Sequence, residues 1–235
     1  MVSNYKLINV GEHATPVIVI DDFLPDAQSM VDVIAQSHRF EKKTDDFYPG
    51  VRSHAPDAYV AHLHRTLPAL FAELNGALVD ISQPQLAMAQ LSIANQHPSQ
   101  LSPIQCIPHI DTQRDNEWAL VHYLFCAPLG GTAFYRHKET GLERVNASQY
   151  HHYFSTLKRQ ATSVGLPAKA YINGDTAMFK QIACVEALFN RALLYPANLL
   201  HSGCLPDDID KTALHGRHLD VKNARLTANA SILFN

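Results

Sequence analysis

The sequence predicts a mainly β fold in which antiparallel strands form a barrel or sandwich with helices on its flank. Short runs rich in β-branched and aromatic residues, bounded by Gly, Pro and Asn, recur through residues 85–235. Residues 1–84 instead hold two segments in which apolar residues recur at helical spacing. Hydrophobic residues make up 46% of the 235-residue chain, which is enough material for a sizeable core.

Residues 1–84 are expected to form one strand followed by a helical flank. The strand is a β-branched run that ends in two aspartates, and the two helices follow from the spacing of Val, Ile, Leu and Phe side chains. A polar stretch with a Tyr-Pro-Gly turn separates the helices. The expected order is a strand over 16–24, a helix over 25–38, a polar segment over 42–56 and a helix over 57–80.

Residues 85–235 are expected to form the β core, with one intervening helix. The expected strands lie over 86–95, 104–110, 118–126, 132–137, 176–188, 191–195 and 225–234, and the helix over 147–164. No internal repeat, linker or low-complexity segment divides the chain, so residues 1–235 are expected to form a single domain. The polar segments 42–56 and 206–223 are candidate substrate lids because they are long and flanked by turn residues.

The overall charge and the cysteines narrow the function classes. The net charge is −3 and no basic run occurs, so nothing suggests a nucleic acid or an anionic membrane as partner. No stretch approaches the roughly 18 apolar residues of a membrane span, and no signal peptide is visible at the N-terminus. The four cysteines are far apart in sequence and form no CxxC pair, so we expect reduced, mostly buried thiols in a cytoplasmic protein.

Two histidines and one carboxylate are spaced so that they can bind one metal ion. His109 and Asp111 form an H-x-D pattern at the end of an expected strand, where side chains two residues apart point to the same face. The third ligand must come from another strand, and His201 is the best candidate. Two His and one carboxylate on one face of an octahedral ion leave three positions open, which is characteristic of non-haem Fe(II) oxygenases.

The other histidine pairs are weaker candidates, and a chain with 14 histidines produces short motifs by chance. One pair lies two residues apart on an expected helix, so its members face apart. A second is adjacent on a polar helix and is expected to be solvated, and a third lies in a polar loop with no supporting context. These pairs are His62 with His64, His151 with His152, and His215 with His218.

The last expected strand has one polar and one apolar face. Arg225, Thr227, Asn229 and Ser231 alternate with the apolar Leu226, Ala228, Ala230, Ile232 and Phe234. A polar face inside a small barrel is unfavourable unless it meets a polar group. An Arg fork with a hydroxyl two residues away suits the carboxylate of a ligand. The alternative is an edge strand whose polar face is solvated.

The order of these motifs resembles that of the 2-oxoglutarate- and Fe(II)-dependent dioxygenases, especially their prolyl-hydroxylase-like branch. The matching motifs are His109-Ile-Asp111, Gly130-Gly-Thr-Ala-Phe-Tyr135, Tyr195-Pro-Ala-Asn-Leu-Leu-His201 and Arg225-Leu-Thr227. The chain is also similar to a group of uncharacterised bacterial proteins in this superfamily, which share Tyr48-Pro-Gly50 and the final Ala-Arg-Leu-Thr strand. The resemblance covers about residues 16–235.

The resemblance implies a double-stranded β-helix (jelly-roll, cupin-like) core that carries an enzyme. It implies that His109, Asp111 and His201 hold Fe(II), and that O₂ and 2-oxoglutarate are consumed with release of succinate and CO₂. Halogenases of the superfamily replace the metal carboxylate with a small residue, so the presence of Asp111 favours hydroxylation. The expected substrate is an amino acid, a peptide side chain or a small metabolite, and the oligomeric state is left open.

Two alternatives stay open at this point. Arg225 with Thr227 is the expected anchor for the far carboxylate of 2-oxoglutarate. However, Arg225 follows His201 at a longer interval than the family's basic residue does, and this makes Arg217 in the polar insert a rival. Functions of a different class are a non-catalytic metal- or ligand-binding β-helix module and a cupin-like metalloenzyme that uses no 2-oxoglutarate.

Overall fold

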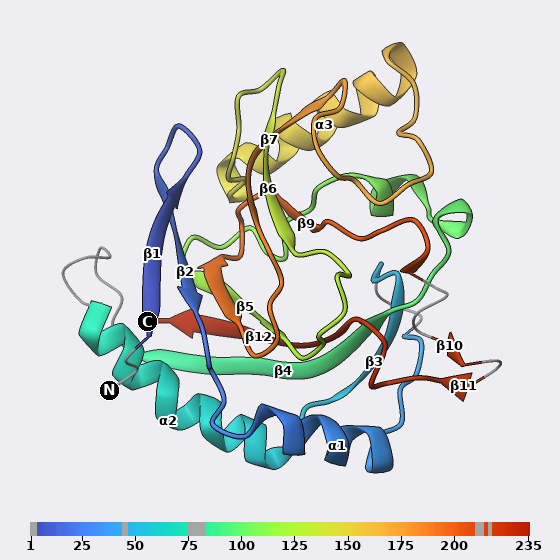
Figure 1. The fold of residues 1–235 in the computed structure, drawn as a ribbon. Coiled ribbons are helices and arrows are strands. Elements are labelled where there is room, and N and C mark those ends of the chain that lie inside the picture. Colours follow the sequence, from blue (N-terminus) through green and yellow to red (C-terminus); the bar gives the residue numbers. More distant parts are fainter. Residues whose placement is uncertain (1–3, 44–46, 75–82, 210–213, 216–217) are drawn as a thin grey trace.

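A large and a small antiparallel sheet, with three α-helices, make up most of the described part of the computed structural model (Figure 1). The structure describes residues 4–43, 47–74, 83–209, 214–215 and 218–235. The large sheet has the order β1 (Tyr5–Val10), β2 (Thr15–Ile20), β8 (Ala192–Pro196), β5 (Glu117–Tyr123), β12 (Leu226–Phe234), β4 (Pro84–Ala94) and β3 (Gly50–His54). The small sheet has the order β7 (Phe179–Val185), β6 (Thr132–His137) and β9 (His201–Gly203).

Three apolar cores result from this arrangement. The first lies between the large sheet and the helices α1 (Ala27–Ser37) and α2 (Asp57–Leu74), which run along its outer face (Figure 1). The second fills the space between the two sheets. The third joins the outer face of the small sheet to α3 (Ala147–Ser163). Each sheet therefore has one face toward the interior and one face covered by helices.

The helices begin and pack as their sequences dictate. The N-cap Asp26 of α1 accepts a hydrogen bond from the backbone N–H of Ser29, and α3 begins with a capping box between Asn146 and Gln149. The apolar stripe of α2 is buried as expected, with Leu63, Leu67, Leu70, Phe71 and Leu74 all inside. All three expected helices are confirmed within the described residues.

Several strands differ from the prediction. β1 and β3 are present although the first 84 residues were expected to hold one strand, and both belong to the large sheet. The strand expected over 104–110 is wrong. Pro103 opens a short 3-10 helix, Pro103–Cys106, which Ser102 and Gln105 stabilise through a capping box. A second 3-10 turn, Pro98–Gln100, precedes it.

The candidate lid segments are only partly described. In the first candidate lid, over 42–56, β3 occupies residues 50–54 and pairs with β4, so this part of the segment is not a loop. The insert over 206–223 contains the two-residue strands β10 (Leu214–His215) and β11 (His218–Leu219), which pair with each other. Arg217 lies outside the described residues. None of the described helices is long and apolar enough to cross a membrane.

β12 occupies the middle of the large sheet rather than an edge. It pairs with β4 on one side and with β5 on the other. Its apolar side chains lie in the core under α1 and α2, as the alternation predicted. The polar face of β12 therefore points into the space between the sheets, and the alternative of a solvated edge strand is excluded.

All four cysteines are free thiols. Cys106 and Cys204 are buried, whereas Cys126 and Cys184 are exposed, so the expectation of mostly buried thiols holds for half of them. The Sγ atoms of Cys184 and Cys204 lie 3.3 Å apart.

Candidate functional site

Backbone pairing brings the H-x-D segment beside the strand that carries His201. His109 and His201 form an antiparallel bridge in which each backbone N–H donates to the other's carbonyl at 2.9 Å. The backbone N–H of Asp111 donates to the carbonyl of Ala197 at 2.8 Å. Although residues 104–110 are not a strand, the chain is extended enough at this point to place His109 and Asp111 on the same side.

The structure brings the three predicted metal ligands together. His109 Nε2 lies 3.6 Å from one Asp111 carboxylate oxygen, and His201 Nε2 lies 3.7 Å from the other. One ligand atom from each residue falls within 4.8 Å of the other two, and no other such group of His, Cys, Asp or Glu occurs among the described residues. Two imidazole nitrogens and one carboxylate oxygen are the donor set of non-haem Fe(II) sites.

The two imidazoles of this candidate metal site lie in different environments. His201 is buried, and its Nδ1 donates to the carbonyl of Leu199 at 2.8 Å, which leaves Nε2 as the free lone pair. The side chain of His109 is 51% exposed. The protein packed around its ring and the neighbouring His201 nevertheless lower the pKa of His109 below its ordinary value of 6.5. A neutral ring at pH 7 can act as a ligand.

Arg225 is a buried cation without an acidic partner among the described residues. It is 6% exposed, and it donates from Nε to the carbonyl of Leu129 at 3.1 Å and from Nη2 to that of Gly131 at 2.9 Å. Its guanidinium carbon lies 5.8 Å from the Tyr123 ring centroid and 5.6 Å from that of Phe125. A buried guanidinium that has only carbonyl and aromatic partners is suited to an anionic ligand.

Polar groups continue from Arg225 along the inner face of the large sheet. Thr227 is 2% exposed, and its hydroxyl donates to the carbonyl of Ser92. The Asn229 amide donates to the hydroxyls of both Thr227 and Ser92 at 3.0 Å. Thr227 is paired in register with Tyr123, whose hydroxyl hydrogen-bonds to Thr132 at 2.7 Å. This face therefore offers hydroxyl and amide groups in a largely dry interior.

Tyr195 lies beside His201, and in the sequence it was noted only as the first residue of the motif that ends at His201. Its ring lies 4.8 Å from that of His201, and the residue is 1% exposed. Burial raises the pKa of the Tyr195 hydroxyl, Asp111 raises it further, and Arg225 lowers it. The Tyr195 hydroxyl is therefore within electrostatic reach of both Asp111 and Arg225.

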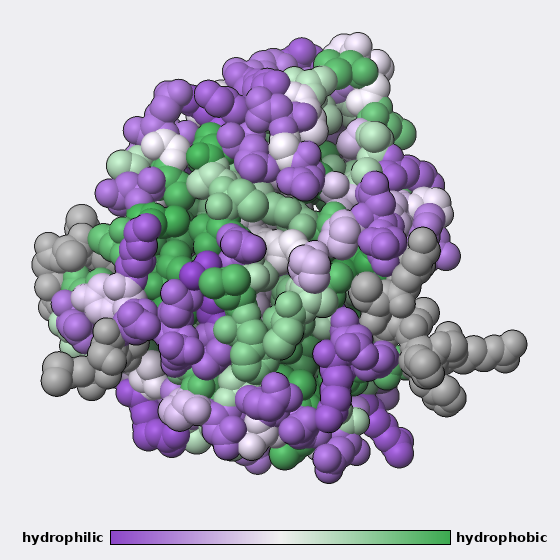
Figure 2. Space-filling view, viewed as in Figure 1, coloured by the Kyte–Doolittle hydropathy of each residue, from purple (hydrophilic) through white to green (hydrophobic). Residues whose placement is uncertain are grey.

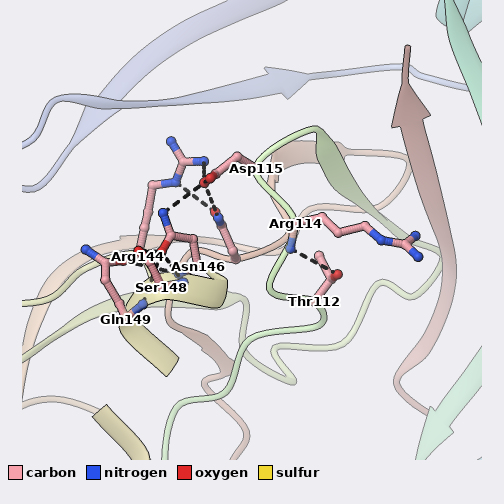
Figure 3. A network of polar contacts seen from close by, with 8 residues as sticks. Thr112, Arg114, Asp115, Arg144, Asn146, Ser148 and Gln149 are labelled. Carbon is pink, nitrogen blue, oxygen red and sulfur yellow. Dashed lines mark hydrogen bonds and ion pairs between the residues drawn. The ribbon is translucent and has the colours of Figure 1, made fainter. Parts of the chain in front are cut away.

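The segment after Asp111 is held in place by a polar network (Figure 3). The Asp115 carboxylate accepts hydrogen bonds from Arg144 at 3.3 Å, Asn146 at 3.2 Å and Asn198 at 2.8 Å. Asn198 lies three residues before His201, so the network ties both ligand-bearing segments to the start of α3. A polar recess of about 1070 Å³ begins at Asp111 and extends over this segment.

The other histidines whose side chains are described do not join a second candidate metal group. His62 is buried and His64 exposed, so they face apart, and His151 and His152 are both exposed. His122 is fully buried and pairs with the Asn190 amide oxygen at 3.0 Å, and burial lowers its pKa to about 3.

A family model matches almost the whole chain. It is DUF6445, described as a family of unknown function, and it matches residues 2–232. The chain belongs to DUF6445. No curated protein matches this DUF6445 chain.

Solved structures are similar to the DUF6445 chain at the level of fold. HygX from Streptomyces hygroscopicus, with nickel and 2-oxoglutarate bound, has a TM-score of 0.53 at 11% identity over 94% of this chain and 84% of that one. AviO1 from Streptomyces viridochromogenes has a TM-score of 0.48 at 14% identity over 93% of this chain and 90% of that one. A Trichoplax adhaerens prolyl hydroxylase in complex with a hypoxia inducible factor peptide has a TM-score of 0.45 at 12% identity over 93% of this chain and 82% of that one.

The match to HygX establishes the fold, because its TM-score is above 0.5. The DUF6445 chain has the jelly-roll core of the 2-oxoglutarate/Fe(II) oxygenase structures, with helices on its flank, as the motif order indicated. The Gly-Gly motif has a steric cause in this fold. A Cβ on Gly130 would lie 1.6 Å from the carbonyl oxygen of Cys204, and one on Gly131 would lie 2.0 Å from that of Val185.

Proposed function

We propose that this DUF6445 protein is an Fe(II)- and 2-oxoglutarate-dependent dioxygenase that hydroxylates an amino acid, a peptide side chain or a small metabolite. The observation that carries the proposal is the convergence of His109, Asp111 and His201 on one point within a fold of this type. The buried Arg225, which has no acidic partner among the described residues, supports a dicarboxylate co-substrate.

Each residue of the site has a defined task in the proposed reaction. His109, Asp111 and His201 would hold Fe(II), and Arg225 with Thr227 would bind the far carboxylate of 2-oxoglutarate. When bound, iron and 2-oxoglutarate supply O₂-dependent oxidation of a C–H bond, with succinate and CO₂ as products. The buried ring of Tyr195 would exclude water beside His201, and the buried ring of Tyr123 would do so beside Arg225.

Substrate is proposed to approach from the accessible side of the triad. Asp111 is 44% exposed and borders the polar recess, whereas His201 is buried. On the face shown in Figure 2, apolar side chains gather over the centre and hydrophilic side chains surround them. A small molecule or a peptide with polar groups fits the polar recess beside Asp111.

We propose that residues 1–235 form one oxygenase domain, because β1, β2 and β3 belong to the same sheet as β12. We also propose a cytoplasmic location, because the four cysteines are far apart in sequence and form no CxxC pair.

An anaerobic titration tests the proposal most directly. Fe(II) is added to the purified protein with 2-oxoglutarate, and we expect a weak visible charge-transfer band that needs both components. His201→Ala should abolish the band, whereas His152→Ala, a solvated histidine, should leave it unchanged. Iron binding without any response to 2-oxoglutarate would instead support the cupin-like alternative. Binding of both without iron-dependent release of succinate would support a non-catalytic module.

A further inference from the structure

The small sheet carries a pair of thiols that the proposed reaction does not use. Cys184 lies on β7 and Cys204 directly follows β9, and both strands flank β6. Cys184 and Ser202 are paired in register with the same residue, Ala133, whose small side chain lets the thiols approach each other above it. Their Sγ atoms lie 3.3 Å apart, which is close to van der Waals contact and longer than a disulfide bond of about 2.05 Å.

The two thiols have different environments. Cys184 is exposed, whereas Cys204 is buried in the core under α3. The hydrogen bond from Cys204 lowers the pKa of the Cys184 thiol, while the same contact and burial raise the pKa of Cys204. An accessible thiolate beside a second, resolving thiol is the arrangement found in redox-sensitive cysteines.

Cys204 is linked to Arg225 through one backbone carbonyl. The carbonyl of Gly131 accepts hydrogen bonds from the Cys204 backbone N–H at 3.1 Å and from Arg225 Nη2 at 2.9 Å. The carbonyl of Cys204 also packs closely against Gly130, since a Cβ on Gly130 would overlap it. A displacement of the Cys204 backbone is therefore expected to disturb the Gly131 carbonyl, to which the Arg225 guanidinium donates.

We infer that Cys184 and Cys204 are a redox modification site, and that a disulfide between them displaces the Arg225 end of the proposed 2-oxoglutarate site. The thiols lie on the outer face of the small sheet and His201 on the inner face, so an oxidant reaches Cys184 without entering the active site. The effect on 2-oxoglutarate rests on the proposed function, whereas the modification itself does not.

A low-molecular-weight disulfide, for which oxidised glutathione is the probe, supplies the oxidising equivalents. The Cys184 thiolate attacks one glutathione sulfur, forms a mixed disulfide and releases one glutathione thiolate. Cys204 then loses its proton and attacks the Cys184 sulfur, which releases the second glutathione. Two protein thiols are oxidised and one glutathione disulfide is reduced to two thiols.

The first measurement is peptide mapping by mass spectrometry after incubation of the full chain with oxidised glutathione. We expect a Cys184–Cys204 linkage that dithiothreitol reverses. Cys184→Ser should abolish it, whereas Cys126→Ser, which removes an exposed thiol elsewhere, should not. Absence of the linkage in the wild type, or cross-linking of Cys184 to Cys126 instead, would overturn the inference.

The second measurement tests the link to Arg225 without any ligand. Hydrogen exchange of residues 129–132, 201–205 and 225–227 should increase when the disulfide forms, and Cys184→Ser should be insensitive to the oxidant. An oxidised protein with unchanged exchange in these three segments would refute the coupling.

The affinity for 2-oxoglutarate, measured anaerobically with Fe(II), should fall by about fivefold or more on oxidation. A reduced protein that binds no 2-oxoglutarate would count against the proposed function. The mapping and exchange results would still decide the inference.

Discussion

Arg225 provides the sharpest test of the proposed co-substrate site. Two of its five N–H groups donate to the carbonyls of Leu129 and Gly131, so three remain for a ligand. A charge-assisted fork to a carboxylate is worth on the order of 1.5–3 kcal/mol. At 1.4 kcal/mol per tenfold, Arg225→Ala should weaken 2-oxoglutarate binding roughly ten- to hundredfold.

The same substitution leaves the buried carbonyl of Leu129 without the donor that Arg225 supplies, so it should also lower the free energy of unfolding by about 1–3 kcal/mol. The carbonyl of Gly131 keeps the hydrogen bond from the Cys204 backbone N–H. Fe(II) affinity separates the two effects, because a folded variant keeps His109, Asp111 and His201 and should bind iron almost normally. Arg225→Lys should recover only part of the 2-oxoglutarate affinity, since an ammonium cannot form the bidentate contact.

The assay is anaerobic 2-oxoglutarate binding in the presence of Fe(II), with thermal unfolding of each variant as a control. Thr227→Val should cost about one neutral hydrogen bond, or roughly two- to tenfold in affinity. Arg217→Ala should have little effect. If Arg217→Ala strongly reduced the affinity for 2-oxoglutarate and Arg225→Ala did not, Arg217 in the insert would be the carboxylate-binding residue instead of Arg225. Wild-type affinity in both would argue that the chain does not use 2-oxoglutarate.

Three further predictions concern the ligands and the packing around them. His109→Ala, Asp111→Ala and His201→Ala should each abolish Fe(II) binding while circular dichroism stays native, with Asp111→Ala the best tolerated for folding; a variant that retains wild-type iron affinity removes that residue from the ligand set. His122 is buried as the neutral base, with a pKa of about 3 against 6.5 when unfolded, so its contribution to stability is complete above pH 6.5 and is lost as the pH falls toward 3. The loss in the free energy of unfolding is about 2 kcal/mol at pH 5. Chemical denaturation at pH 7.5 and pH 5 should therefore show a smaller loss of unfolding free energy for His122→Gln than for the wild type, and equal losses would contradict the role of His122. Glu143 is fully buried and accepts the backbone N–H groups of Glu12 at 2.9 Å and His13 at 3.3 Å, so Glu143→Ala should lower the unfolding free energy by about 1.5–3 kcal/mol without changing iron affinity, and a loss of iron binding in the folded variant would show that the reasoning is wrong.

The local sequence pattern was sufficient to predict a helix or a strand where one face of that element packs against the core. The alternation in β12 and the helical spacing in α2 were predicted correctly, because burial selects the period of apolar residues directly. β1 and β3 were missed because their side chains are only partly buried and their existence depends on pairing with β2 and β4. The 3-10 helix at Pro103 was missed because Ser102 was taken for a loop residue and Gln105 for part of a strand, so their capping box was not recognised.

The candidate site was predictable in part for the same reason. His109, Asp111 and His201 are polar residues that packing in an apolar core does not require, so their spacing was noticeable in the sequence. The structure brings the three side chains together. A tyrosine on a buried strand resembles any other core residue in sequence, so Tyr195 was noted within the His201 motif but was not predicted to lie beside the His201 ring. The Cys184–Cys204 pair depends on the register of two strands across β6, and that register is not visible in sequence.

The central place of β12 has a consequence for how the protein is made. β4 and β5 are consecutive strands in the chain, yet they do not pair with each other, because β12 lies between them. A ribosome releases β12 after every other strand, so the large sheet stays divided into two unpaired halves until synthesis has passed residue 234. Nascent chains should therefore expose the edges of β4 and β5, and a chain cut before Leu226 should be captured by chaperones rather than fold with one strand fewer.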